Sequence, residues 1–244
     1  MLQGLFNYDN PIWRFIGKLA DLMILNLLWI ICSLPVFTIG ASTTALYYVT
    51  LKLARDEGTS TAASFFRSFK SNFRQATALW LLIIAAGIVL TVDCWFFFTG
   101  QMPMAEPVKL LLTSLSICLF IFYFFIVIYI FPLQSRFYNP VMKTLVNAFL
   151  MSVRYLPITI GILITDLLIG AVFCFSFFYL PQLSVFLTLF GLPLAAFINS
   201  FFLNYVFKRF MPKESQRDEF QISPLIGQED EALKEAIENL KNRS

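Results

Sequence analysis

Long apolar segments separated by short polar loops follow one another from Leu19 to Phe207. Four of these segments are long enough to cross the hydrocarbon core of a bilayer, which takes about 20 helical residues. The four predicted membrane-spanning helices cover residues 76–99, 108–131, 157–180 and 183–207. The pattern therefore predicts an all-α protein, a polytopic transmembrane helical bundle.

The N-terminal part of the chain allows either one or two further crossings. No charged residue occurs from Leu22 to Leu51, a stretch longer than one crossing, and Pro35 and Gly40 interrupt it. Because proline and glycine both disfavour a continuous helix, we expect two helices, near residues 13–34 and 38–55, joined by a tight turn. The sequence thus predicts six spans, with five as the alternative.

Basic residues gather in alternate loops, and this pattern predicts the orientation of the chain. They occur in residues 52–74, in residues 133–154, where no acidic residue accompanies them, and directly after the last predicted span. The opposite loops carry almost no charge. Since cytoplasmic loops of membrane proteins are enriched in Lys and Arg, we expect a multi-pass protein of the cell membrane with both termini in the cytoplasm.

Two of the predicted cytoplasmic connections have amphipathic patterns. In residues 62–76, phenylalanines recur at helical spacing and basic residues occupy the other faces. These basic residues are Arg67, Lys70 and Arg74. Residues 141–154 repeat the pattern more weakly. Such segments are typical of amphipathic elbow helices that lie in the headgroup plane, so the lipid bilayer is their expected partner.

The composition changes after Pro212, which divides the chain into two predicted parts. Residues 1–212 form the transmembrane helical domain, and residues 213–244 form a charged cytosolic tail. Within this tail, Gln228 to Lys241 has apolar residues on one face of a short acidic helix. The tail is interpreted either as a loosely attached segment or as a docking peptide for a soluble partner.

Composition and motifs exclude several classes of function. Hydrophobic residues make up 58% of the chain and charged residues 14%, which is typical of membrane proteins. The net charge of +3 comes from loop residues near lipid headgroups and does not indicate nucleic-acid binding. The chain has no histidine, no Cys-x-x-Cys pair and no glycine-rich phosphate loop. We therefore expect neither a metal nor another cofactor, and no enzymatic activity.

Acidic residues inside predicted spans are the main candidates for function, because a charge in lipid is costly. Asp166 lies close to the middle of its span, and Asp93 lies nearer the external end of another. Tyr47 and Asn199 complete the candidate intramembrane polar site. Tyr47 belongs to a polar stripe on one helix face that we expect to be buried against protein. If the candidates face one cavity, a transport function is favoured.

Asp166 has two interpretations. It can act as a proton or cation relay or as a hydrogen-bond acceptor for a substrate, next to a break in the last span at Gly191 and Pro193. Alternatively it is a structural carboxyl group that is protonated, or that is hydrogen-bonded to Asn199, Asn204 or a backbone group across the helix interface.

A third intramembrane acid, Asp21, has a simpler interpretation. It follows Lys18 by three residues, close to the predicted cytoplasmic face. Residues at this spacing are neighbours on a helix surface, so we expect a local ion pair between them.

The N-terminal sequence also resembles a known family. Residues 5–53 read LFNYDNPIWRFIGKLADLMILNLLWIICSLPVFTIGASTTALYYVTLKL, and residues 65–76 read FFRSFKSNFRQA. Both stretches resemble the YesL-like family of predicted integral membrane proteins of Gram-positive bacteria, a family of unknown function. The resemblance implies a genomic context of carbohydrate ABC importers, two-component sensors and polysaccharide-degrading enzymes. It supplies no catalytic residues.

Two functions follow as hypotheses. The first is a non-enzymatic accessory or regulatory component of a carbohydrate uptake or sensing system, with ABC importer or sensor subunits as partners, which the resemblance implies. The second is a small-solute or ion transporter or channel that uses Asp166 inside the membrane.

Overall fold

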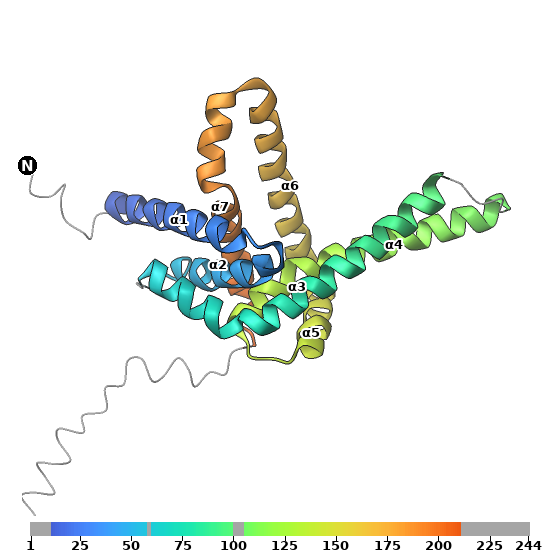
Figure 1. Cartoon of the computed structure of the whole chain (residues 1–244), viewed down its shortest axis with the longest axis horizontal. Coiled ribbons are helices and arrows are strands. Elements are labelled where there is room, and N and C mark those ends of the chain that lie inside the picture. Colours follow the sequence, from blue (N-terminus) through green and yellow to red (C-terminus); the bar gives the residue numbers. More distant parts are fainter. Residues whose placement is uncertain (1–10, 58–59, 100–104, 211–244) are drawn as a thin grey trace, which may run out of the picture. The chain divides into compact units, whose positions relative to one another are not determined.

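The computed structural model describes residues 11–57, 60–99 and 105–210, and within these ranges the chain is helical, without strands. The described residues form seven α-helices and one short 3-10 helix, and Figure 1 labels the α-helices. They are α1 (Pro11–Ser33), η1 (Val36–Thr38), α2 (Ile39–Leu53), α3 (Thr61–Thr99), α4 (Glu106–Arg136), α5 (Val141–Arg154), α6 (Leu156–Tyr179) and α7 (Pro181–Phe207). The all-α prediction is confirmed. The contacts discussed below lie within the compact unit that ends at Val206, and the predicted tail lies outside the described residues.

Proline marks the places where helices begin and turn. Helices α1 and α7 start at a proline, and α4 and α6 have one in their first turn, where a missing N–H is harmless. The predicted turn at Pro35 is present between α1 and α2. There the Thr38 hydroxyl lies 2.6 Å from the carbonyl oxygens of both Cys32 and Pro35. These contacts satisfy carbonyl groups where α1 ends.

Five helical segments of the described chain are long and apolar enough to cross a membrane, as expected of a multi-pass membrane protein. They are Trp13–Ser33, Thr61–Thr99, Glu106–Arg136, Leu156–Tyr179 and Leu187–Phe207. Helix α2 forms as predicted, but its 15 residues measure only about 22 Å. It is therefore shorter than the ~30 Å hydrocarbon core.

The two predicted elbows differ from each other in the structure. The first is not a separate helix, because residues 62–76 and the following span form the single helix α3 of 39 residues. No proline or glycine occurs in α3 before Gly87, so nothing in the backbone ends the helix at the predicted boundary. The second elbow is a helix of its own, α5, which ends at Arg154, two residues before α6 starts at Leu156.

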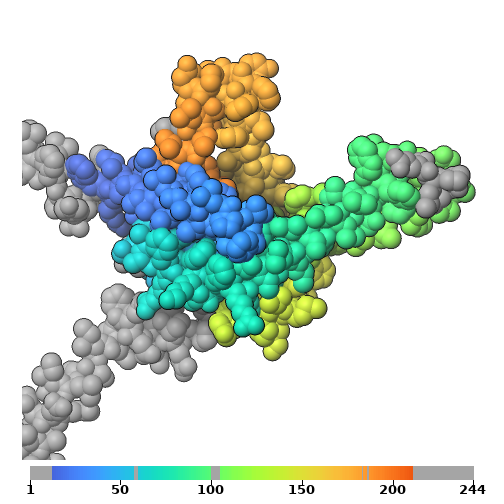
Figure 2. Space-filling model, in the orientation of Figure 1, coloured from blue at the N-terminus to red at the C-terminus, as the bar shows by residue number. Residues whose placement is uncertain are grey.

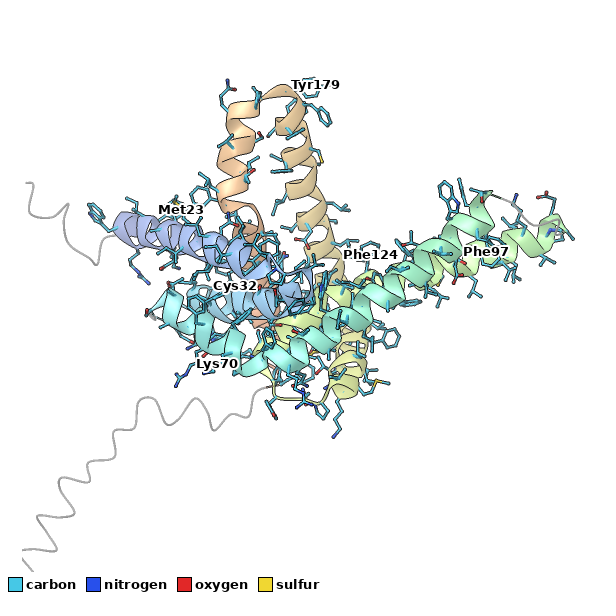
Figure 3. The ribbon with its side chains drawn as sticks, viewed as in Figure 1. Met23, Cys32, Lys70, Phe97, Phe124 and Tyr179 are labelled. Atoms are coloured by element: carbon cyan, nitrogen blue, oxygen red, sulfur yellow. The ribbon has the colours of Figure 1, made fainter. Side chains whose placement is uncertain are left out.

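The long helices carry large apolar side chains on their outer surfaces. Phe98 near the end of α3 is 79% exposed, and Phe178 near the end of α6 is 78% exposed. Figure 3 shows side chains, among them the labelled Phe97, Phe124 and Tyr179, projecting from the long helices. Such continuous apolar exposure is unfavourable in water and is expected of helices that face lipid.

Helix α2 occupies the centre of the packed region. Figure 2 shows α1 and α2, in blue, against the first part of α3, in cyan. The core around α2 consists of buried apolar residues from four helices. They are Leu22, Leu25, Ala45, Leu46, Val49, Leu53, Phe65, Phe190 and Ala196. Because ten of the 15 residues of α2 are buried, this short helix is surrounded mainly by protein.

Glycine allows α2 to approach α3 closely. A Cβ atom at Gly40 would lie 2.5 Å from both the carbonyl oxygen of Ala76 and the Cβ of Trp80. Since the first of these is a backbone atom, a side chain at this position would push the two helices apart. The indole of Trp80 also donates to the carbonyl oxygen of Val36 at 2.8 Å, which holds the turn before α2 against α3.

A cluster of charged residues brings together the start of α1 and the end of α2. Asp56 follows α2 and accepts contacts from Lys18 Nζ at 2.6 Å and from Arg14 at 3.2 Å. Arg55 donates to Asn204 Oδ1 on α7 at 3.0 Å. Helices α1 and α2 are therefore an antiparallel pair whose charged ends lie together.

This cluster corrects one prediction. Lys18 pairs with Asp56 rather than with Asp21, although Asp21 is its near neighbour on α1. Asp21 instead accepts a hydrogen bond from the Thr61 hydroxyl at 2.5 Å, at the start of α3. The backbone of Asp56 has a positive φ of 58°, and the turn it forms presents its carboxylate to α1.

Buried polar contacts also hold α1 against α7. Pro193 has no N–H, so the carbonyl oxygen of Leu189, four residues earlier, lacks its usual helical partner. The side-chain amide of Asn26 donates to this oxygen at 2.9 Å and to that of Thr188 at 2.8 Å. Asn26 is only 4% exposed. The sequence predicted a break in the last span at Gly191 and Pro193. In the structure α7 continues through both residues without interruption.

The pairing of Asn26 with Pro193 predicts a coupled effect on stability. Asn26→Ala should lower the free energy of unfolding by about 1–2 kcal/mol, because a buried carbonyl oxygen loses its donor. In a Pro193→Ala background the new backbone N–H can bond the carbonyl oxygen of Leu189. Asn26→Ala should therefore lower the free energy of unfolding by less in that background. A double-mutant cycle measured by unfolding in mixed micelles checks this. If Asn26→Ala lowers the free energy of unfolding equally in both backgrounds, the predicted coupling is wrong.

The ion pairs of Asp56 predict a pH-dependent contribution to stability. The hydrogen bond from Lys18 is the main cause that lowers the pKa of Asp56 below its ordinary value. The pairs therefore stabilise the fold at neutral pH, and this contribution disappears as the pH falls below about 4. Asp56→Asn, which tolerates the positive φ, should lower stability by less than about 1 kcal/mol at pH 7, because exposed pairs are screened. Thermal unfolding of both proteins from pH 7 to pH 3 should show the difference in stability beginning to shrink as the pH falls below about 4.

Candidate functional site

A cavity of about 510 Å³ lies between α1, α2, α6 and α7. Three of the four candidate residues from the sequence line it, namely Tyr47, Asp166 and Asn199. The other polar residues in the lining are Asn26, Trp29, Thr43 and Thr188. This volume is within the range of small-molecule sites, roughly 300–1,000 Å³.

Asp166 and Asn199 form the polar centre of the cavity. The Asn199 amide donates to Asp166 Oδ1 at 2.7 Å. Asn199 is 1% exposed, and its Oδ1 atom has no hydrogen-bond partner among the described residues. Asp166 belongs to the exposed residues of α6 and lines the cavity. The pair thus presents a carboxyl group beside a buried amide oxygen that has no hydrogen-bond partner among the described residues.

Tyr47 faces this pair from α2. It lines the same cavity as Asp166 and Asn199. Trp29 Nε1 donates to Thr43 Oγ1 at 3.2 Å, which links α1 to the same face of α2. The polar stripe of α2 is therefore turned toward protein, as predicted.

The same stripe continues toward the C-terminal end of α2. There the Ser200 hydroxyl of α7 donates to Thr50 Oγ1 in a buried hydrogen bond of 2.9 Å. This contact joins α2 to α7 directly and holds two walls of the cavity together.

Charge is distributed unevenly in this cavity. Asp166 is the single charged residue that the described lining contains. The aromatic side chains of Trp29, Tyr47 and Phe173 and several aliphatic residues supply the rest of the wall. An unbalanced carboxylate in an aromatic cavity attracts groups that donate hydrogen bonds or carry positive charge.

The remaining candidate residues lie elsewhere. Asp93 is exposed on α3 and does not line this cavity. Arg67, Lys70 and Arg74 are exposed on the first half of α3, where Figure 3 labels Lys70. The structure therefore separates the basic residues of the first predicted elbow from the intramembrane polar site.

Asn204, an alternative partner for Asp166, makes other contacts. It accepts a hydrogen bond from Arg55, and its amide donates to the carbonyl oxygen of Leu51 at 3.1 Å. Of the two asparagines that the sequence offered, Asn199 is therefore the partner of Asp166.

Metal binding has no support in the part of the chain that the structure describes. No group of three or more Cys, Asp or Glu side chains there could hold an ion. The four cysteines are free thiols, and two of them, Cys118 and Cys174, are exposed on the outer surface of their helices.

Sequence analysis did not identify Asn26 as part of the site. The sequence contained one indication of this role, because Asn26 is a polar amide in the middle of a 23-residue helix that is otherwise largely apolar. The role of Asn26 depends on Pro193, which is distant in the sequence. Rules based on the spacing of nearby residues could therefore not reveal it. Thr188 was missed for the same reason, because it contributes a backbone carbonyl group.

Comparison with known proteins supports the resemblance of the N-terminal sequence to the YesL-like family. Residues 22–94 match the family described as "Protein of unknown function, DUF624". A curated relative from Bacillus subtilis (strain 168), "Uncharacterized protein YesL", is 28% identical over 138 residues. The match covers 56% of this chain and 63% of that relative, which is less than two thirds of its length. No solved structure matches the chain significantly. These matches confirm that the chain resembles the YesL-like family, whose function is unknown.

Proposed function

We propose that this protein binds a small polar solute in the cavity between α1, α2, α6 and α7 and transports it across the cell membrane. The observation that carries the proposal is the meeting of Asp166, Asn199 and Tyr47 at one cavity. An exposed carboxylate within a membrane-spanning helix is costly, and such residues commonly belong to solute or ion pathways. Shared access to one cavity favours transport over separate structural roles.

The chemistry of the lining limits the class of solute. Asp166 and Asn199 Oδ1 are hydrogen-bond acceptors, and no Lys or Arg belongs to the described lining. A solute that offers N–H or O–H donors, such as an amine or a polyol, satisfies these acceptors. Trp29, Tyr47 and Phe173 provide faces on which a cation or a sugar ring can stack.

Backbone features of α7 support a pathway at the same place. Gly191 lines the cavity and has open space where a side chain would be. Pro193 follows two residues later and removes the backbone donor for the carbonyl oxygen of Leu189, which Asn26 bonds instead. Transporters often place solute sites beside such irregular positions in membrane-spanning helices.

The proposal includes six crossings, with both termini in the cytoplasm. The ion pairs from Arg14 and Lys18 to Asp56 support a return of the chain through α2. Protein surrounds α2, so its short length need not match the lipid thickness. Arg55 lies within electrostatic range of Arg136 at the end of α4, which supports a common face for these helix ends.

This topology predicts where reporters will be active. A fluorescent protein that matures only in the cytoplasm should fluoresce when it is fused to either end of the chain. An alkaline phosphatase that is active only outside should be inactive at both ends and active when it is inserted after Gln101. Opposite results for the two ends would exclude an even number of crossings.

The accessory function implied by the family resemblance stays a prediction. Its partners would be importer or sensor subunits that bind the cytoplasmic connections or the tail. Mild solubilisation followed by affinity capture tests it. Recovery of such subunits together with no solute binding to the purified protein would favour the accessory function over transport.

The transport proposal predicts a specific effect of one carboxylate. Asp166→Asn should weaken solute binding about tenfold or more, because a charge-assisted hydrogen bond becomes a neutral one. The measurement is thermal stabilisation by a panel of amines and polyols, followed by flux of the best ligand into liposomes. Asp93→Asn is the matched control, since it removes an exposed carboxylate outside the cavity, and it should change neither result. Equal effects of both substitutions, or no binding by any member of the panel, would overturn the proposal.

A further inference from the structure

A second, smaller cavity has the opposite electrostatic character. It measures about 320 Å³ and lies between the first half of α3 and the end of α4. Arg67 and Arg136 line it together with neutral polar residues, including Ser71, Asn72 and Gln134. Its described lining contains no Asp or Glu. Two guanidinium groups at one pocket favour an anionic ligand.

Hydrogen bonds fix the neutral wall of this pocket. Gln134 is 2% exposed, and its amide donates to Asn72 Oδ1 at 3.4 Å. The Thr144 hydroxyl donates to Gln134 Oε1 at 3.2 Å, and the Asn72 amide donates to the carbonyl oxygen of Ser68 at 3.1 Å. These contacts join α3, α4 and α5, so the pocket is formed before any ligand binds.

The basic side of the pocket has an excess of positive charge. Arg67 is exposed, and Arg136 lies within electrostatic range of Arg55 and Glu57. The Glu57 carboxylate already accepts a hydrogen bond from Arg55. Lys52 adds a further positive charge nearby, because its Nζ lies 4.9 Å from the ring centre of Tyr48, which lines the pocket. An anion would therefore enter a positive potential.

The surroundings of the pocket indicate where its ligand comes from. The candidate span α4 ends at Arg136, which corresponds to the level where headgroups meet water. The pocket lining itself contains three aromatic side chains, those of Tyr48, Phe137 and Tyr138. Tyr138, which lines the pocket, is 94% exposed. A free anion in water needs no such apolar surroundings, whereas a lipid does.

We propose that this pocket binds the phosphate of an anionic phospholipid, with Arg67 and Arg136 as its donors. Planar guanidinium groups donate two hydrogen bonds at a time to phosphate oxygens, and the polar wall can bond the rest of the headgroup. This differs from a general attraction of basic helices to membranes, because it uses Arg136, which lies on another helix. It is also independent of the solute cavity and of its proposed function.

Binding to the full-length protein in neutral detergent, after removal of lipid, tests the proposal. Native mass spectrometry should show one phosphatidylglycerol molecule retained per chain at concentrations where phosphatidylcholine is not retained. Arg67→Gln should weaken this binding about tenfold or more. Arg74→Gln is the matched control, because it removes the same charge from the same helix outside the pocket, and it should change the affinity by about twofold or less.

Three outcomes would overturn the proposal. Equal losses in Arg67→Gln and Arg74→Gln would show attraction by overall charge rather than a pocket. Inorganic phosphate that displaces the lipid at equal concentration would show that the pocket recognises free phosphate. A photo-crosslinking residue at Ser71 that captures the acidic tail instead of lipid would show that the chain itself occupies the pocket. Solute binding should be unchanged in Arg67→Gln, which separates this test from that of the transport proposal.

Discussion

The amide of Asn26 holds α1 against α7 where Pro193 removes a backbone donor from α7. In a membrane interior no water is present to satisfy the carbonyl oxygen of Leu189, so another part of the protein must do so. Placing Asn26 there fixes the distance between two helices that also form walls of the cavity around Asp166. The cavity therefore depends on a hydrogen bond that lies at its edge, and Asp166 and Asn199 are positioned by the same packing.

Helix α2 connects this region with the rest of the described chain. It is packed by α1, α3 and α4, and it bonds α7 through Thr50. Small residues make this possible, since Gly40 lets the backbone of α2 approach α3 more closely than any side chain would allow. Helices in lipid gain little from hydrophobic burial and associate through such close packing and hydrogen bonds. The cavity of Asp166 and the basic pocket of Arg67 and Arg136 both include residues of α2, namely Tyr47 and Tyr48.

The parts of the structure that depend on local sequence were predictable. Long apolar segments located the helices, and Pro35 located the turn before α2, because a bilayer and a proline each impose strict local limits. The hydrogen bond between Asp166 and Asn199 was among the expected alternatives. Contacts set by tertiary packing were not predictable. Lys18 prefers Asp56 to its helix neighbour, and the role of Asn26 appears only when Pro193 lies beside it.

The burial of α2 has a consequence for how the chain is assembled during synthesis. Ser42, Thr44 and Thr50 are fully buried among other helices, and these hydroxyl groups gain nothing from contact with acyl chains. A segment so short and so rich in hydroxyl groups is a poor candidate for release into lipid by itself. In the six-crossing topology proposed above, α2 would enter the membrane only with neighbours that are translated after it, so the order of translation would become part of the folding mechanism.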